Sequence, residues 1–77
     1  MIDEVVADLL VEIFQVNRRS LHTMSSLESA GLDSLARAEL GAELKERFRF
    51  PIPEHLLRAA TTLGELSEFL RVARERP

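Results

Sequence analysis

Cysteine is missing from the 77-residue chain, and its absence excludes two common ways of stabilising a small domain. No disulfide can form within the chain, and no metal site can be built from thiolates. The chain has two histidines, His22 and His55, but their separation in sequence does not match the spacing of metal ligands. We therefore expect no metal site, and we expect the fold to depend on a small hydrophobic core.

Long hydrophobic runs and an excess of basic residues are also missing. No apolar run approaches the roughly 20 residues that a transmembrane helix needs. The N-terminus carries Asp3, Glu4 and Asp8 instead of a basic region followed by an apolar one, so it does not fit a signal peptide. The formal net charge of −3 argues against nucleic acid as a partner. We expect a cytoplasmic monomer that binds neither nucleic acid nor a membrane.

Hydrophobic residues make up 45% of the chain and charged residues 30%, as in ordinary globular domains, and the length corresponds to one domain spanning residues 1–77. Apolar residues recur at helical spacing in four stretches. The predicted helices run from Ile2 or Asp3 to Val16, from Ser34 to about Phe48, from Pro53 or Glu54 to Ala59, and from Leu63 to about Arg74. The predicted fold is all-α: a small four-helix bundle of three longer helices and one short helix, with a long loop after the first helix.

The apolar face of each helix gives a predicted core, and hydrophobic residues of the loop are predicted to anchor the loop to it. The core set is Val6, Leu9, Ile13, Leu40, Leu44, Phe48, Leu56, Leu63, Leu66 and Phe69, and the loop set is Leu21, Met24, Leu27 and Leu32. Two segments, Ser25–Glu28 and Thr62–Glu65, fit the capping box that starts a helix. The first predicts a turn within the loop, and the second predicts the start of the last helix.

The most informative stretch is Gly-Leu-Asp-Ser-Leu at residues 31–35, between the loop and the second helix. Asp33 and Ser34 are both favourable N-cap residues, because their side-chain oxygens accept hydrogen bonds from the free N–H groups of a first helical turn. Gly31 permits a positive φ, and Leu35 opens the apolar pattern. Taken alone, these residues predict a turn and a helix cap without chemistry.

A longer segment, Leu27–Leu35, resembles the signature of the acyl carrier protein family, in which Asp-Ser-Leu follows a glycine after a short loop. Thr-x-Gly-x-Leu at residues 62–66 also resembles the family, and the resemblance extends from the first helix to the last. It implies that the Ser34 hydroxyl carries 4′-phosphopantetheine, a covalent cofactor derived from coenzyme A, and that an acyl group is held on its thiol as a thioester. It also implies that Asp33 helps to present Ser34 to the transferase.

The same resemblance implies a carrier that is not an enzyme. Its partners would be a phosphopantetheinyl transferase, which uses Mg²⁺, and an acyltransferase, a ketosynthase or other acyl-processing enzymes. No catalytic residue is expected within the chain. A Ser-His-Asp triad would need a histidine near Ser34, and neither histidine has the flanking signature of one.

The helix after Ser34 carries two apolar strips on roughly opposite sides. One strip is the predicted core face. The other contains Leu35, Ala38 and Ala42, would be partly exposed and is a candidate partner surface, although alanine also suits any helix. In the carrier family this helix is the main recognition helix, so the resemblance implies partner contacts at Leu35, Ala38, Glu39 and Ala42.

Residues 34–49 contain four basic and three acidic residues, so their summed charge is +1. Carriers of primary fatty-acid synthesis are usually strongly acidic here. The departure favours a carrier of a specialised pathway such as polyketide or antibiotic biosynthesis. The extent of the chain, from Met1 to just past the last predicted helix, leads us to expect a free-standing carrier, with a domain excised from a larger synthase as the alternative. One alternative is a peptidyl or aminoacyl carrier of a nonribosomal-peptide-type pathway, although those usually have glycine or histidine in place of Leu32 or Asp33. Another is a helical interaction module without a prosthetic group, in which Gly-Leu-Asp-Ser is only a cap.

Two further residues of this helix bear on the cargo. Arg37 lies one turn after Ser34, near the core face, where its stem can cover the core edge while its guanidinium reaches water. A second interpretation places Arg37 at the mouth of an acyl pocket, where it would meet a polar or carboxylated cargo. Gly41 either leaves room for a cargo chain or allows close packing of another element.

Overall fold

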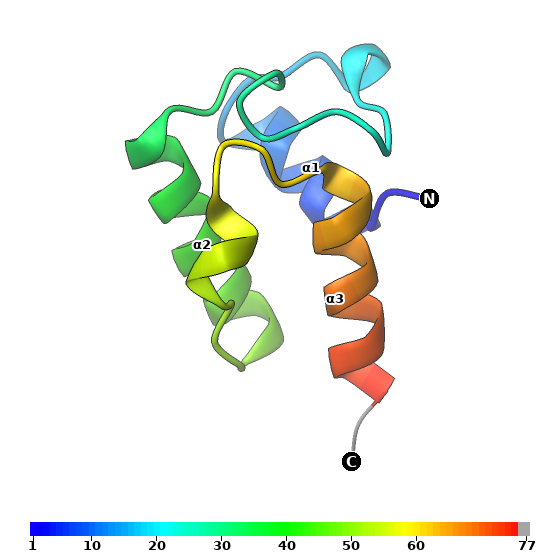
Figure 1. Cartoon of the computed structure of the whole chain (residues 1–77), viewed down its shortest axis with the longest axis vertical. Coiled ribbons are helices and arrows are strands. Elements are labelled where there is room, and N and C mark those ends of the chain that lie inside the picture. The colour runs from blue at the N-terminus through cyan, green and yellow to red at the C-terminus, as the bar shows by residue number, and fades with distance from the viewer. Residues whose placement is uncertain (76–77) are drawn as a thin grey trace.

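The computed structural model describes residues 1–75, and these contain three α-helices. The helices are α1 (Glu4–Glu12), α2 (Ser34–Phe48) and α3 (Leu63–Glu75), and two 3₁₀ turns, η1 (Arg18–Ser20) and η2 (Glu54–Leu57), lie between them. In Figure 1, α2 and α3 run along the long axis, η2 lies next to α2, and the long loop crosses one end of the bundle. None of the helices in the described part has the length and hydrophobicity that a membrane crossing requires.

The all-α class is confirmed, but the predicted count of four helices is not, because the short third helix is the 3₁₀ turn η2. Pro53 precedes this turn, and Arg58 after it has an extended backbone with φ −80° and ψ 159°. Four residues lie between them, which is too few to offset the cost of nucleating an α-helix. The segment closes instead with a tighter hydrogen bond of 3.0 Å from the Leu56 N–H to the Pro53 carbonyl.

Helix α1 is shorter than predicted, since it ends at Glu12 and not at Val16. At Gln15 the backbone is left-handed, with a φ of 57°. The chain folds back there, and the Val16 N–H donates a hydrogen bond of 3.0 Å to the Leu10 carbonyl. The apolar face of α1 is therefore not continued through Ile13, which is 43% exposed. The prediction that Ile13 belongs to the core is wrong.

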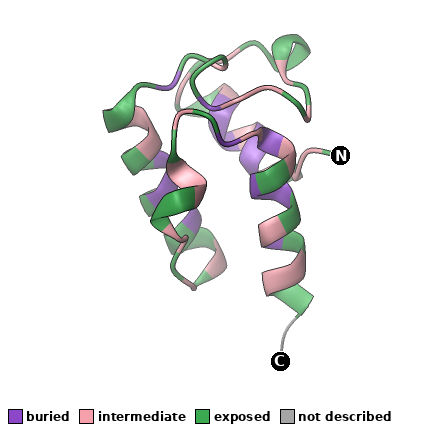
Figure 2. Ribbon diagram, in the orientation of Figure 1, coloured by how far each residue is buried: buried purple, intermediate pink, exposed green. Residues whose placement is uncertain are grey.

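The core is formed by aliphatic side chains from all three α-helices and from the loop. They are Val6, Leu9, Leu10, Leu27, Leu32, Leu40, Leu44, Leu63, Leu66 and Leu70. Three of the predicted core residues, Phe48, Leu56 and Phe69, pack against this cluster but are only partly buried. Figure 2 shows buried and exposed residues alternating along α2 and α3, as the apolar periodicity predicts, whereas α1 is exposed only at its ends, Glu4 and Glu12.

The long loop is fixed to the rest of the molecule. Leu27 and Leu32 belong to the core and Leu21 packs against it, which confirms three of the four predicted anchors. A backbone hydrogen bond of 2.8 Å from the Leu27 N–H to the Thr61 carbonyl also joins the loop to the segment before α3. The loop is therefore held against the core up to the start of α2.

The turn predicted within the loop is present at residues 27–30, but the capping box predicted for Ser25 and Glu28 is wrong, because the hydroxyl that accepts the bond from the Ser29 N–H, at 3.0 Å, is that of Ser26. The Ser25 hydroxyl accepts a hydrogen bond of 3.2 Å from the His22 N–H, which lies before it in the chain, and no helix starts there. This bond closes a turn in which Met24 is 82% exposed. The fourth predicted loop anchor, Met24, is therefore not one.

The capping box at the start of α3 is confirmed. The Glu65 N–H donates to the Thr62 hydroxyl, and the Thr62 N–H donates to the Glu65 carboxylate, both at 3.0 Å. The bond from the Thr62 backbone, together with the bond to its side chain, lowers the pKa of Glu65. At the start of the last helix, each of these two side chains therefore accepts a hydrogen bond from the backbone N–H of the other residue.

We expect Thr62→Ala to lower the free energy of unfolding by about 1 kcal/mol and to bring the pKa of Glu65 back toward its ordinary value of 4.5. Because the folded-state pKa lies below that value, the stabilisation from the Glu65 carboxylate is present above it and is lost as the pH falls through the folded pKa. Urea denaturation measures the first effect, and an NMR titration of the carboxyl measures the second. An unchanged Glu65 pKa in the variant would contradict this account.

Arg74, in the last turn of α3, contacts two other elements. Its Nη2 donates a hydrogen bond of 2.8 Å to Oδ2 of Asp3, the N-cap of α1. Its guanidinium lies 5.2 Å from the centre of the Phe48 ring, at the end of α2. One side chain therefore connects the start of α1 with the ends of α2 and α3.

Candidate functional site

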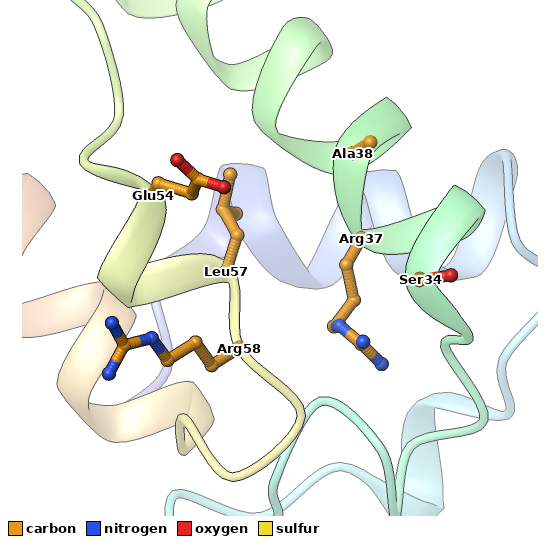
Figure 3. A pocket seen from close by; sticks show the side chains of 6 residues that line it. All are labelled: Ser34, Arg37, Ala38, Glu54, Leu57 and Arg58. Atoms are coloured by element: carbon orange, nitrogen blue, oxygen red, sulfur yellow. The ribbon is translucent and has the colours of Figure 1, made fainter.

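Ser34 is the first residue of α2, as predicted, and it is exposed. Asp33 is the N-cap: its backbone is extended, and its Oδ1 accepts a hydrogen bond of 2.8 Å from the Ala36 N–H. The Asp33 carboxylate thus stabilises the first turn of α2. The Ser34 hydroxyl makes no hydrogen bond with another residue in the range 1–75. In Figure 3 its oxygen points away from Leu57 and Arg58.

The turn before Ser34 is held in place by two side chains. Leu32 is only 2% exposed and belongs to the core. Its carbonyl accepts a hydrogen bond of 2.9 Å from Nη1 of Arg37, one turn into α2. Gly31 has a φ of 96°, and a Cβ there would meet nothing within 4 Å, so the glycine is required by the backbone conformation and not by lack of space.

We expect Gly31→Ala to lower the free energy of unfolding by about 1–2 kcal/mol, because an L side chain disfavours positive φ. Urea denaturation at neutral pH measures the effect. Ala30→Ser is the matched control, since it changes the neighbouring side chain without a positive φ at that position. Equal stability of Gly31→Ala and the unmodified protein would contradict the proposed backbone requirement.

A groove of about 490 Å³ lies beside Ser34, between α2 and η2 (Figure 3). It is lined by Ser34, Arg37, Ala38, Glu54, Leu57 and Arg58. Behind it, a Cβ at Gly41 would lie 2.5 Å from Cδ1 of Leu57. Of the two roles considered for Gly41, the structure shows close packing: the glycine makes room for the Leu57 side chain.

The predicted partner surface lies on the outer side of α2. Leu35 is 68% exposed, and Ala38, Glu39 and Ala42 are exposed as well. The opposite side of the helix is buried through Leu40 and Leu44. The geometry thus leaves the four residues accessible, while their part in partner recognition stays a prediction.

Sequence reasoning did not single out Glu54 and Arg58 as residues of the site. They follow Ser34 by an entire helix and come close to it only because η2 folds back against α2. The signal available in the sequence was limited to the short helix predicted from Pro53 or Glu54 to Ala59 and the core position predicted for Leu56. Neither observation places a charged residue beside Ser34.

The charged and polar groups that line the groove beside Ser34 are the Ser34 hydroxyl, the Arg37 and Arg58 guanidinium groups and the Glu54 carboxylate. The lining includes no histidine, so the Ser34 hydroxyl has no imidazole base there. Within residues 1–75, no cluster of three or more histidine, cysteine, aspartate or glutamate side chains could hold a metal ion.

Comparison with protein families gives a match to the family described as the phosphopantetheine attachment site, over residues 4–70. A search of curated proteins gives no match. The matched range is most of the chain and includes α1, α2 and η2. An exposed serine hydroxyl beside an open groove, with no hydrogen bond to the part of the chain that the structure describes, fits the covalent attachment of such a group.

Domains of this family carry covalently bound 4′-phosphopantetheine and are not enzymes, which confirms the cofactor and the non-enzymatic role expected from the sequence. They are modified by phosphopantetheinyl transferases and serve acyl-processing enzymes. Because the match spans most of the chain, this protein belongs to the phosphopantetheine-attachment family and is a carrier domain.

Proposed function

We propose that the chain is an acyl carrier protein that holds an acyl group as a thioester on a 4′-phosphopantetheine arm attached to Ser34. It would deliver this group to partner enzymes of polyketide or related specialised biosynthesis. The observation that supports the proposal most directly is the position of Ser34: an exposed hydroxyl at the first residue of α2, directly after the capping Asp33.

The residues around Ser34 have separate tasks in this proposal. Leu32 fixes the turn to the core, Asp33 caps the helix, and Arg37 binds the Leu32 carbonyl, so the serine has a defined position when a transferase approaches. The bound arm supplies a thiol that accepts the acyl group. Because the chain has no cysteine, this thiol would be the only one on it.

The partners in this proposal are a phosphopantetheinyl transferase and then an acyltransferase, a ketosynthase or related enzymes. Leu35, Ala38, Glu39 and Ala42 supply the contact surface. The charge of +1 over residues 34–49 makes long-range attraction to basic enzymes weak, so recognition depends more on shape and apolar contact. The chain would act in the cytoplasm as a monomeric domain spanning residues 1–77.

Intact mass spectrometry tests the proposal. The protein is incubated with coenzyme A, Mg²⁺ and a promiscuous phosphopantetheinyl transferase, and we expect a gain of one phosphopantetheine per chain. With an acyl-coenzyme A as donor, the gain should include the acyl group. No gain in a sample whose circular dichroism shows the folded helices would contradict the proposal and favour a helical interaction module, in which Asp33 is only a cap.

A further inference from the structure

We propose that Arg37 is a positioning residue for the attachment of phosphopantetheine, and that it acts by fixing the joint between the long loop and α2, directly before Ser34. The inference deepens the proposed function and depends on it, because it takes Ser34 as the acceptor of the arm. Figure 3 shows the Ser34 oxygen pointing away from the Arg37 side chain. Arg37 would therefore act on the position of the serine and not on its hydroxyl.

The hydrogen bonds on the two sides of this joint belong to different parts of the fold. On the helix side, the Asp33 carbonyl accepts a hydrogen bond of 2.9 Å from the Arg37 N–H, and Oδ1 of Asp33 accepts one of 2.8 Å from the Ala36 N–H. On the loop side, the Leu32 N–H donates a hydrogen bond of 3.0 Å to the Leu27 carbonyl. The joint is therefore the peptide link between Leu32 and Asp33.

The loop side of the joint is fixed by the rest of the molecule. Leu32 is only 2% exposed, and both Leu27 and Leu32 belong to the core cluster. The Leu27 N–H also donates a hydrogen bond of 2.8 Å to the Thr61 carbonyl, in the segment before α3. The position of the Leu32 carbonyl is therefore determined by the core and by that segment.

The Arg37 side chain connects the two sides. Its Nη1 donates a hydrogen bond of 2.9 Å to the Leu32 carbonyl, and the residue is half-buried. Within residues 1–75, no other hydrogen bond joins residues 27–32 to residues 33–48. The Leu32 carbonyl precedes the N-cap, so the hydrogen bonds of the helix itself do not include it. The guanidinium supplies the missing donor, and its charge strengthens the bond.

An ion pair would be the usual structural reason for a partly buried arginine, but Arg37 has none in the described chain. The ion pairs among residues 1–75 involve Arg18, Arg71 and Arg74. A guanidinium that only reaches water, as one interpretation of the sequence predicts, would not need the bond to Leu32. The bond across the joint is therefore the contact that distinguishes Arg37 from a solvated surface arginine.

Attachment of the arm requires an accurate position for one atom. The Ser34 Oγ forms a bond to the phosphorus of coenzyme A that carries the pantetheine, and the bond from that phosphorus to the bridging oxygen breaks. Adenosine 3′,5′-bisphosphate leaves, and the hydroxyl proton passes to the solvent. A turn that is already fixed does not have to be ordered when the transferase binds. Ordering the backbone of one residue corresponds to roughly a 5- to 30-fold change in an equilibrium constant.

The kinetics of attachment test this inference with two substitutions. Arg37→Met keeps a long unbranched side chain and removes every N–H donor, whereas Arg37→Lys keeps a charged donor. With coenzyme A, Mg²⁺ and a promiscuous transferase, intact mass gives the rate at a series of carrier concentrations. We expect Arg37→Met to raise the KM for the carrier roughly 10-fold and to change kcat by less than about twofold, because the cost of ordering the turn is met on binding. Arg37→Lys should restore most of the KM.

A second measurement reports on the turn itself. NMR relaxation gives the order parameter of each backbone N–H in the free protein, which is about 0.85 for a rigid backbone and below about 0.6 for a flexible one. We expect Arg37→Met to lower the values of Asp33 and Ser34 toward the flexible range, while the values in α3 stay unchanged. Arg47→Met is the matched control. Arg47 is an exposed residue of the same helix and forms no ion pair within residues 1–75, so its substitution should change neither the KM nor the order parameters.

The outcomes separate this inference from the proposed function. If the unmodified protein gains no arm, the proposed function fails. If it gains the arm and Arg37→Met has an unchanged KM, the positioning role alone is overturned. A raised KM with unchanged order parameters also overturns it, because Arg37 would then contact the transferase directly. An Arg37→Met protein whose circular dichroism shows no folded helices overturns it as well, since the bond would then serve folding.

Discussion

We expect Ser34→Ala to abolish the mass gain with coenzyme A and transferase completely while the protein stays folded. The substitution removes the hydroxyl that would be esterified and leaves no other hydroxyl in residues 31–35. Stability should change by less than about 0.5 kcal/mol, because Ser34 is exposed and makes no hydrogen bond in the described chain. The Asp33 cap on the Ala36 N–H is retained. Intact mass and circular dichroism on the same sample measure both effects.

Ser29→Ala is the matched control for this experiment. Ser29 is also an exposed serine close to the motif, but its hydroxyl donates a hydrogen bond of 3.0 Å to the Ser26 carbonyl, and it does not line the groove. We expect this variant to gain one phosphopantetheine like the unmodified protein. A mass gain that persists in Ser34→Ala would place the attachment at another residue and remove the assignment of Ser34.

The second large effect is expected on the other side of the motif, where Leu32→Ala should lower the free energy of unfolding by about 2–5 kcal/mol. Leu32 is 2% exposed and contacts the core from the turn that carries Ser34. For a chain of this length, the total stability is on the order of 4–11 kcal/mol. The substitution should therefore leave a marginal domain, and the urea midpoint should fall accordingly.

Leu35→Ala is the matched control, because it makes the same chemical change three positions along the chain. Leu35 is 68% exposed, so we expect its truncation to change the stability by less than about 0.5 kcal/mol. If Leu35 contacts partner enzymes, this variant should instead slow phosphopantetheinylation or acyl transfer. Equal destabilisation by the two substitutions would contradict the burial that distinguishes them.

The elements that the sequence predicts well are those with a local signal. Helix α2 runs from Ser34 to Phe48 as predicted, because the Asp33 cap and the apolar periodicity agree on its start. The end of α1 was missed because Gln15 takes up a left-handed backbone. Glutamine gives no local signal for that conformation, so the apolar pattern alone did not mark the end of the helix.

The candidate site divides in the same way. The sequence motif predicts Asp33 and Ser34, and the helical periodicity predicts the exposed strip of α2, which contains Leu35, Ala38 and Ala42. Neither signal predicts Glu54 and Arg58, because their approach to Ser34 depends on how η2 folds back and on the space that Gly41 leaves for Leu57. Such pairings between distant segments depend on side-chain fit, which a single sequence does not display.

The contact between Asp3 and Arg74 has a topological consequence. These residues lie 71 positions apart, and their side chains meet at 2.8 Å, so the described polypeptide is nearly a closed ring. A short linker between the two positions would complete that ring, and new chain ends could be opened at η1, which contains no buried residue. A circular permutant of this kind would keep the core and the turn before Ser34, and it would present the same serine from a chain with a different order of helices.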